Sequence, residues 1–393
     1  MFDEFGLMEE QSAIQTLARK FAKEHILPVA AELDGMEDVT ANFPWDMIKE
    51  AYKIGFKTLA LPADMGGEAI GALTRAIILD ELAYADSTCA KIISQFWSNV
   101  RPIVAQGTPY QYECFLKPFR DIPTYQICVA MTEPDYGSDN IIPYAEVEGG
   151  LKLSATKKGD GYVLNGVKHF NSIGGVAELF IVSGRTDKNA PVHKGITKFL
   201  VTRDTPGFSV AKVHNRIGWR AYQAAELVFD NVYVPKENIL GEVNRVQAGG
   251  RGGAFHLIEL AANATGMARI AYDSALDHAK RRVQGGKHII EHQYVAGILA
   301  DMYIRLQAAR SLVWHTAWVL DNSEHFDDKL PIACSDFAGR MVTKVTQQAV
   351  SVFGGMGIDK ELPIERYTRD GIIAIVTASM GARKIKLMNL LRE

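Results

Sequence analysis

The sequence predicts an α+β protein, mostly α, in which a small β-domain separates two helical domains, because the spacing of its apolar residues changes twice. From Glu9 to about Pro118 these residues recur at helical spacing. Between roughly Gln126 and Leu240 they alternate with polar residues, and many are β-branched, which is typical of strands. Helical spacing returns from about Gly253 onward. We therefore expect three domains, at residues 1–123, 124–242 and 243–393.

The two outer regions each show the pattern of several helices. In the first, Ala13, Leu17 and Phe21 recur at helical spacing, and residues 38–44 and 65–67 interrupt the pattern. In the last, long periodic stretches follow one another without intervening strands, which favours a four-helix bundle. These stretches run from Leu257 to Lys280, from Tyr294 to Asp321 and from Pro331 to Val352.

The middle region is expected to form a small β-barrel or sandwich. The segment Tyr162–Val167 contains an Asn165-Gly166 pair, which predicts a hairpin turn at that point. Further strands are predicted at Leu179–Val182 and Ile196–Val201, where apolar and β-branched residues dominate.

Composition excludes several classes of function. A chain of 393 residues exceeds the usual limit of a single core, and its net charge of -3 argues against a nucleic-acid surface. No apolar run is long enough to span a bilayer, and the acidic first residues lack the parts of a signal peptide. The cysteines show neither metal-binding nor disulfide spacing, so we expect no metal site and a reducing cytoplasm. They are Cys89, Cys114, Cys128 and Cys334.

Three blocks of sequence stand in a fixed order along the chain. Met131–Asp139 reads MTEPDYGSD, Arg216–Arg220 reads RIGWR, and Phe353–Gly357 reads FGGMG and leads to Arg369-Asp370. Together they resemble the acyl-CoA dehydrogenase superfamily from about residue 8 to the C-terminus. The resemblance implies a helix, β-domain, helix architecture with FAD between the β-domain and the C-terminal bundle.

Four residues match family positions around the flavin ring. An isoalloxazine ring needs polar backbone groups at one edge, a donor near N5 and a flat or apolar neighbour. By resemblance Met131, Thr132, Phe170 and Ser172 occupy these positions. Phe170 stands where the family has a stacking aromatic, and Ser172 keeps the hydroxyl of the usual threonine. Outside this context Phe170 would be interpreted as an ordinary core residue.

The pyrophosphate of FAD needs cationic or hydroxyl partners and closely approaching backbone. Ser138 and Arg282 match the family's positions for this role, and Gln293 follows Arg282 at the family's separation. Gly285 replaces the phenylalanine of the family's R-x-x-F-G pattern. This departure leaves a gap beside the cofactor.

A glycine pair near the C-terminus resembles one that contacts the dinucleotide of a neighbouring subunit. Gly354 and Gly355 form this pair, and Ser351 stands where the family commonly has glutamine. Alone, a Gly-Gly pair would indicate only a turn. The resemblance implies a homotetramer or dimer of dimers, because flavin sites in the family borrow residues across an interface.

Oxidation of an acyl-CoA needs a base for the α-proton, donors that stabilise the enolate, and flavin N5 as acceptor of the β-hydride. In the commonest family arrangement the base is a glutamate about eight residues beyond the Arg-Asp pair. Here that position falls at Thr377, Ala378 or Ser379. No acidic residue stands between Asp370 and Glu393. The usual base is therefore missing from the sequence.

Some relatives carry the base on the first long helix of the bundle, where the matching position is His256. Glu259 lies one helical turn later, on roughly the same face. A histidine has a suitable pKa for a base, and burial can raise that of a glutamate. The alternatives are a packed histidine and a glutamate that faces solvent or pairs with an arginine.

The helix expected at 88–106 resembles a wall of the acyl pocket and is unusually polar. Lys91 and Gln95 could contact a polar or cyclic acyl group. The alternative is a surface helix that extends its charges into solvent. Trp97 is expected to be packing.

These residues favour an FAD-dependent dehydrogenase that acts on an unusual acyl-CoA thioester (short, cyclic or polar) with a relocated base, Glu259 or His256. Two alternatives stay open. One is a non-redox lyase of the decarboxylase or desulfinase type, in which a cation such as Lys91 orients an anionic leaving group. The other is a catalytically silent subunit that completes the FAD site of an active homologue. By resemblance, an electron-transfer flavoprotein is the expected electron acceptor.

Overall fold

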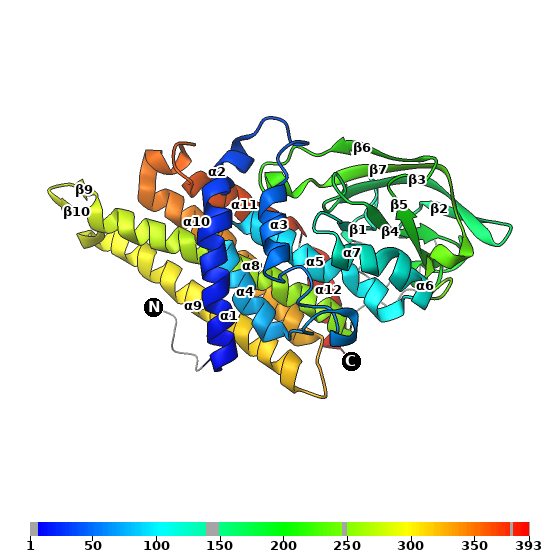
Figure 1. Ribbon diagram of the computed structural model, residues 1–393. Helices are drawn as coiled ribbons and strands as arrows, with labels where there is room; N and C mark the ends of the chain where they lie inside the picture. Colours follow the sequence, from blue (N-terminus) through cyan, green and yellow to red (C-terminus); the bar gives the residue numbers. More distant parts are fainter. Residues whose placement is uncertain (1–6, 139–148, 246–249, 378–379, 393) are drawn as a thin grey trace.

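A computed structural model describes residues 7–138, 149–245, 250–377 and 380–392. The predicted fold class is confirmed, because helices from both ends of the chain form one body and a β-sheet domain packs against it (Figure 1). The predicted boundaries at 123/124 and 242/243 remain predictions.

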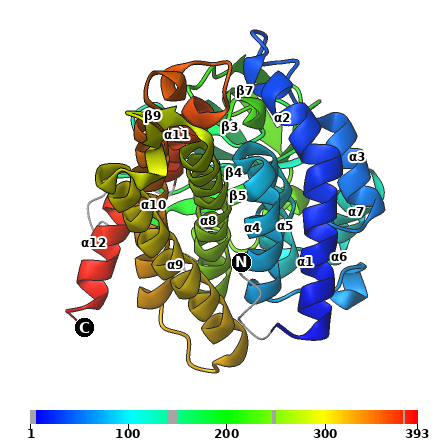
Figure 2. The same ribbon diagram turned by 90° about the vertical axis from the view of Figure 1, so that its left-hand side faces the viewer.

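The N-terminal helices pack along the length of this body (Figure 2). A π-helical turn, Ala22–Ile26, joins the first two helices. Asp86 is the N-cap of helix α5, and its carboxylate accepts the Cys89 N–H at 2.8 Å. The helices are α1 (Glu9–Phe21), α2 (Leu27–Gly35), α3 (Trp45–Lys53), α4 (Ala72–Ala85), α5 (Ser87–Gln106), α6 (Pro109–Gln111) and α7 (Lys117–Asp121).

The middle domain contains one sheet of strand order β6-β7-β3-β2-β4-β5-β8, and β1 pairs in parallel with β4. Its inward-facing side chains form a core of their own, separate from the helical core. The strands are β1 (Ile127–Ala130), β2 (Ser154–Lys158), β3 (Gly161–Asn171), β4 (Leu179–Arg185), β5 (Ile196–Thr202), β6 (Phe208–Val213), β7 (Ala225–Val234) and β8 (Ile239–Leu240).

The hairpin turn predicted at Asn165-Gly166 is wrong. Strand β3 runs straight through this pair, and its register with β7 shifts between Leu164 and Gly166, which marks a bulge. The turn lies instead at Gly159-Asp160, where Gly159 has a φ of 62°. A local Asn-Gly signal was therefore overridden by pairing across the sheet.

The C-terminal region supplies long helices, as predicted. A short hairpin of β9 (Val283–Gln284) and β10 (Lys287–His288) lies at the end of the body farthest from the β-domain (Figure 1). The helices are α8 (Gly250–Arg281), α9 (Gln293–Asn322), α10 (Lys329–Phe353), α11 (Ile364–Thr377) and α12 (Met380–Leu390).

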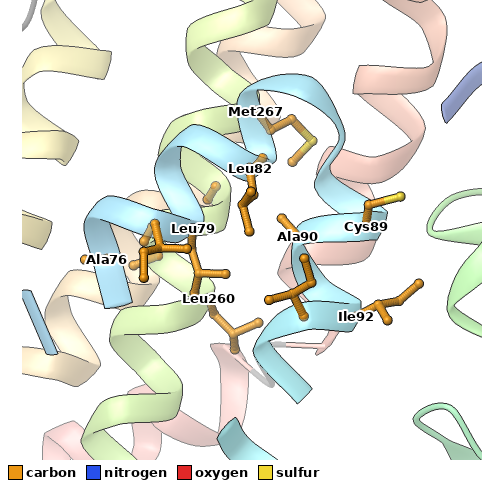
Figure 3. Packing of buried hydrophobic residues seen from close by; sticks show 14 of the residues in the cluster. Ala76, Leu79, Leu82, Cys89, Ala90, Ile92, Leu260 and Met267 are labelled. Atoms are coloured by element: carbon orange, nitrogen blue, oxygen red, sulfur yellow. The ribbon is translucent and has the colours of Figure 1, made fainter. Parts of the chain in front are cut away.

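Helices α4, α5 and α8 share the apolar interior that positions the candidate site (Figure 3). At Gly266 of α8 an added Cβ would lie 2.3 Å from the carbonyl oxygen of Asp80 in α4. The two helices therefore approach each other closely enough to require glycine there. The labelled side chains of Figure 3 are Ala76, Leu79, Leu82, Cys89, Ala90, Ile92, Leu260 and Met267.

Other structural observations bear on the class of protein. None of the described helices combines the length and apolarity needed to cross a membrane. All four cysteines are free thiols. The described residues contain no cluster of metal-ligating side chains.

Candidate active site

An open pocket of about 600 Å³ lies in the middle domain beyond the end of β1. It is built mainly by the loop of the first sequence block, MTEPDYGS, together with Phe170 of β3. The pocket is lined by Thr132, Glu133, Pro134, Asp135, Tyr136, Gly137, Ser138 and Phe170.

A buried ion pair fixes this loop to the sheet. Lys168 of β3 is fully buried, and its Nζ donates to Glu133 Oε1 at 2.8 Å and to the Met131 carbonyl at 2.9 Å. Glu133 also accepts the backbone N–H groups of Lys152 and Leu153 at 2.7 and 2.8 Å. Burial lowers the pKa of Lys168 to about 8, and the Glu133 charge opposes that change. Glu133 therefore holds the pocket loop in place.

Phe170 presents its ring to the pocket and is 55% exposed, so the core interpretation is wrong. Its backbone is left-handed, with a φ of 52°, which is uncommon for a bulky residue. The ring lies 4.4 Å from that of His169 and 4.2 Å from that of His214. Nearby, the Ser172 hydroxyl hydrogen-bonds to Tyr222. A flat ligand could stack on an aromatic surface of this kind.

The other predicted cofactor residues lie at the opposite end of the helical body. Ring stacking of His278 on Phe353 at 4.1 Å joins the ends of α8 and α10 there. The single chain therefore brings the predicted flavin contacts together as two separate groups (Figure 1). The distant group consists of Arg282, Gln293, Ser351, Gly354 and Gly355, all of them exposed.

Glu259 of α8 is buried and already bound by several donors. Its carboxylate accepts hydrogen bonds from Arg75 at 3.1 Å, Ser98 at 2.7 Å and Arg101 at 3.4 Å. The Arg75 guanidinium also lies over the ring of Phe255 at 4.2 Å. The alternative of a glutamate paired with arginine is therefore observed. A proton acceptor in this position would first have to exchange these donors for a substrate.

His256, one turn earlier, is half-buried and in a different environment. Neither of its ring nitrogens bonds to a described residue. Burial lowers the pKa of His256 well below its usual value, and the charges of Lys91, Arg383 and Arg101 lower it further. The lowered pKa favours the neutral imidazole, and no donor from the described part of the chain occupies its lone pair.

Lys91 and Gln95 of α5 are buried, with exposures of 3% and 4%, so the surface-helix alternative is wrong for them. Lys91 Nζ bonds only Ser94 Oγ, at 3.3 Å, among the described residues. Burial lowers the pKa of Lys91 to about 8. Trp97 is packing, as expected, because it is fully buried and donates to the Phe56 carbonyl at 2.7 Å.

The Arg369-Asp370 pair connects α11 to the RIGWR block. Asp370 accepts the Trp219 N–H at 2.7 Å, and Arg369 donates to the Ile217 carbonyl at 2.6 Å. Burial raises the pKa of Asp370 to about 7, with the Asp86 charge as the next cause. The position of the usual base follows on this helix. Ala378 and Ser379 lie outside the described residues.

Sequence models of one protein family match all three domains of this chain. Acyl-CoA dehydrogenase models match residues 8–121 as the N-terminal domain, 128–232 as the middle domain and 257–392 as the C-terminal domain. The chain belongs to the acyl-CoA dehydrogenase family. This is a family of FAD-dependent oxidoreductases.

Individual relatives of this family resemble the chain over nearly its whole length. An acyl-CoA dehydrogenase of Bacillus subtilis is 33% identical over 372 residues, covering 92% of each chain. A short-chain specific acyl-CoA dehydrogenase of Clostridium acetobutylicum is 31% identical and covers 94% of each chain. The solved structure of butyryl-CoA dehydrogenase from Megasphaera elsdenii is 31% identical, with a TM-score of 0.87, and covers 99% of this chain and 100% of that one.

The residues of the open pocket fit the cofactor of an acyl-CoA dehydrogenase. The exposed Phe170 ring offers a flat face, and the pocket loop offers the backbone and the Ser138 hydroxyl. At Gly354 and Gly355 an added Cβ would meet nothing within 4 Å, so backbone there is open to a ligand or a second chain. Both groups are consistent with a dinucleotide that extends from one chain to another.

Some residues of the candidate site cannot be identified from the sequence. No sequence motif includes a role for Arg75, Ser98 or Lys168. Only their contacts in the folded chain show that they bind Glu259 or Glu133. Arg383 of α12 is another, because it acts on the pKa of His256 from a distant helix. The unusual polarity of residues 88–106 indicates Lys91 as a candidate substrate contact, but the burial of its side chain leaves no signal in the sequence.

Proposed function

We propose that this chain is an FAD-dependent dehydrogenase of an unusual acyl-CoA thioester, with His256 as the relocated base. The observation that carries the proposal is the contrast on α8. Among the described residues, no group hydrogen-bonds to the ring nitrogens of His256, whereas three donors bind Glu259. Family membership and the sequence without an acidic residue between Asp370 and Glu393 support it.

Two copies of the chain would hold the cofactor. Met131, Thr132, Ser138, Phe170 and Ser172 of one copy would contact the flavin and the adjoining phosphates. Arg282, Gln293, Ser351, Gly354 and Gly355 of a second copy would contact the rest. FAD, when bound, supplies the acceptor for a hydride from the β-carbon. A homotetramer or dimer of dimers is the assembly that this division favours.

His256 would accept the proton from the α-carbon of the thioester. Its lowered pKa keeps it unprotonated at neutral pH, although it also makes the imidazole a weaker base. The cations around it would offset this weakness by stabilising the negative charge that develops on the substrate. Glu259 would act mainly by holding Arg75 and Arg101 in place, and it remains the second candidate for the base.

Substitution of His256 tests the proposal. We expect His256→Ala to lower the anaerobic rate of flavin reduction by about a hundred- to ten-thousand-fold, with FAD content unchanged. His315→Ala, an exposed histidine of α9, is the matched control and should keep the rate. An unchanged rate in His256→Ala would refute the assignment. If Glu259→Gln lowers the rate of flavin reduction at unchanged thermal stability while His256→Ala does not, the base is Glu259.

A non-redox lyase is the second candidate, favoured by the buried cation Lys91. In that reaction a C–C bond breaks, CO2 leaves, and a proton is added to the remaining carbon. Product would then form without any change in flavin absorbance, and Lys91→Met would abolish its formation. An electron-transfer flavoprotein as acceptor and a reducing cytoplasm remain proposals from the resemblance and the composition.

A further inference from the structure

Cationic side chains from two helices act electrostatically on the proposed base. Lys91 and Arg101 of α5 and Arg383 of α12 all lower the pKa of His256, and the two arginines also act on Lys91. The carboxylate that acts on Lys91 is that of Glu259, which is already bound by Arg101 and by an arginine of α4. Among the described residues, Lys91 and Arg383 therefore have no carboxylate partner.

The same region contains buried donors without acceptors. Arg383 Nη1 and Gln95 Nε2 are buried and have no hydrogen-bond partner among the described residues. Lys91 Nζ has one weak hydrogen bond to a described residue, to Ser94 Oγ at 3.3 Å. Lys91 and Gln95 stand four residues apart on α5, so they project from the same helical face. Ser98, three residues farther along, contacts Glu259 and places this face against α8.

Unpaired buried donors are rare in folded proteins, and several of them with net positive charge indicate an anionic ligand. A carboxylate could accept hydrogen bonds from an arginine, a lysine and an amide together. We infer that the substrate's acyl chain carries a second anionic group, a carboxylate, which Lys91, Arg383 and Gln95 hold. This inference rests on the proposed function, because it deepens the substrate class of the same site.

The position of the cluster favours the acyl chain over the CoA phosphates as the source of the anion. The proposed base must reach the α-carbon, and the cluster lies close enough to His256 to change its pKa. An anion in the cluster therefore lies within the length of a short acyl chain. The phosphates of CoA lie on the other side of the thioester sulfur.

Binding of unreactive thioethers to the holoenzyme tests the inference. S-(4-carboxybutyl)-CoA carries the carboxylate, S-pentyl-CoA matches its length without the charge, and CoA alone reports the phosphates. We expect calorimetry to give a dissociation constant at least tenfold lower for the carboxybutyl compound than for either of the others. Because thioethers cannot be oxidised, this preference is measured independently of flavin reduction.

Matched substitutions assign the preference to the cluster. Lys91→Met and Arg383→Met should each weaken carboxybutyl-CoA binding at least tenfold and leave pentyl-CoA binding unchanged. Lys384→Met, an exposed cation next along α12, should change neither. Equal binding of the carboxybutyl and pentyl compounds would overturn the inference. So would a preference that survives both substitutions, or CoA alone binding as tightly as carboxybutyl-CoA.

The two proposals fail in different ways. If the protein binds carboxybutyl-CoA preferentially but glutaryl-CoA does not reduce its flavin, the anion site is supported and the dehydrogenase activity is refuted. If glutaryl-CoA and pentanoyl-CoA reduce the flavin equally, the dehydrogenase activity is supported and the anion site is refuted.

Discussion

Lys91 and Glu259 lie in the same buried region between α5 and α8, but their partners differ. In the part of the chain that the structure describes, three donors bind Glu259, whereas Lys91 has a single weak acceptor. A buried charge without a partner destabilises the folded state, and it persists in a protein when it has a functional role. This contrast is the reason to assign structural support to Glu259 and substrate contact to Lys91.

The cost of the Lys91 charge predicts a pH-dependent gain in stability upon its removal. In the folded state the pKa of Lys91 is lowered from 10.5 to about 8. Below pH 8 Lys91 is therefore protonated in both the folded and the unfolded state, and the full cost of burying its charge applies. As pH rises from 8 to 10.5, the folded state loses its proton first and the penalty disappears. At about 1.4 kcal/mol for each tenfold change in proton affinity, the penalty is about 3 kcal/mol.

Urea unfolding of Lys91→Met at pH 7 and pH 10.5 measures this effect. We expect the variant to be more stable than the wild type at pH 7 by up to about 3 kcal/mol, with little difference at pH 10.5. Lys384→Met, which removes an exposed charge, should change stability by less than about 0.5 kcal/mol at either pH. A destabilised Lys91→Met protein at pH 7 would show that the ammonium has a partner in the folded state.

Sequence could indicate which residue types line the site but not their burial or pairing. The resemblance predicts Phe170 and Ser138 as FAD contacts; both line the open pocket, and their contact with FAD remains a prediction. The pairing of Glu259 with arginine was foreseen only as an alternative. Arg383 lies far from Lys91 in the chain, so their proximity depends on how α12 packs and left no signal in the sequence.

At the scale of elements, the close contact of α4 with α8 determines where the α8 residues lie. Gly266 permits this contact, since an added Cβ would lie 2.3 Å from the Asp80 carbonyl oxygen. Backbone cannot yield in the way that the end of a flexible side chain can. The register of α8 against α4, and with it the placement of Glu259 near Arg75, depends on this residue.

Two glycine substitutions in helices should therefore have opposite effects. Gly266→Ala should lower the free energy of unfolding by about 1–3 kcal/mol, because it forces the helices apart. Gly297→Ala in α9, where nothing lies within 4 Å, should raise it by up to about 1 kcal/mol through helix propensity. Chemical denaturation of both variants checks the pair. Equal effects would show that the contact at Gly266 can relax at no cost.

The elements themselves were largely predictable, because long helices and buried strands leave periodic patterns. The predicted stretch 294–321 agrees with α9 almost to its ends, and 196–201 agrees with β5. The Asn165-Gly166 turn failed because the pair forms a bulge in β3 instead. Local turn chemistry is weak evidence where a strand has neighbours on both sides, as β3 does between β2 and β7.

For the whole molecule, the main feature is the separation of the two groups of residues predicted to contact FAD. The open pocket belongs to the β-domain, and the Gly354-Gly355 turn follows the end of α10 in the helical body. Figure 1 shows the β-domain and the β9-β10 end of the helical body on opposite sides of the molecule. If both contact one dinucleotide, a complete site needs two copies. The resemblance of the sequence implies a site shared between copies, but only the fold shows that the two groups lie far apart in one chain.

Complementation between variants tests this division. Phe170→Ala and Arg282→Ala should each lose FAD when pure, since every site then has one defective half. Random subunit exchange between them should restore FAD to about a quarter of the sites, because half of the pairs combine both chains and each such pair has one intact site. The absorbance of retained flavin measures the recovery. Each variant exchanged with itself is the control, and no recovery would contradict a shared site.

The visible spectrum of the purified wild-type protein tests the central claim most directly. It is followed anaerobically while glutaryl-CoA, pentanoyl-CoA and cyclic acyl-CoAs are added in turn. We predict an oxidised flavin band that bleaches, and most readily with the dicarboxylic thioester. A band that never bleaches with any thioester would contradict the dehydrogenase and favour the lyase. A colourless protein would contradict FAD binding by this chain alone and favour a silent subunit.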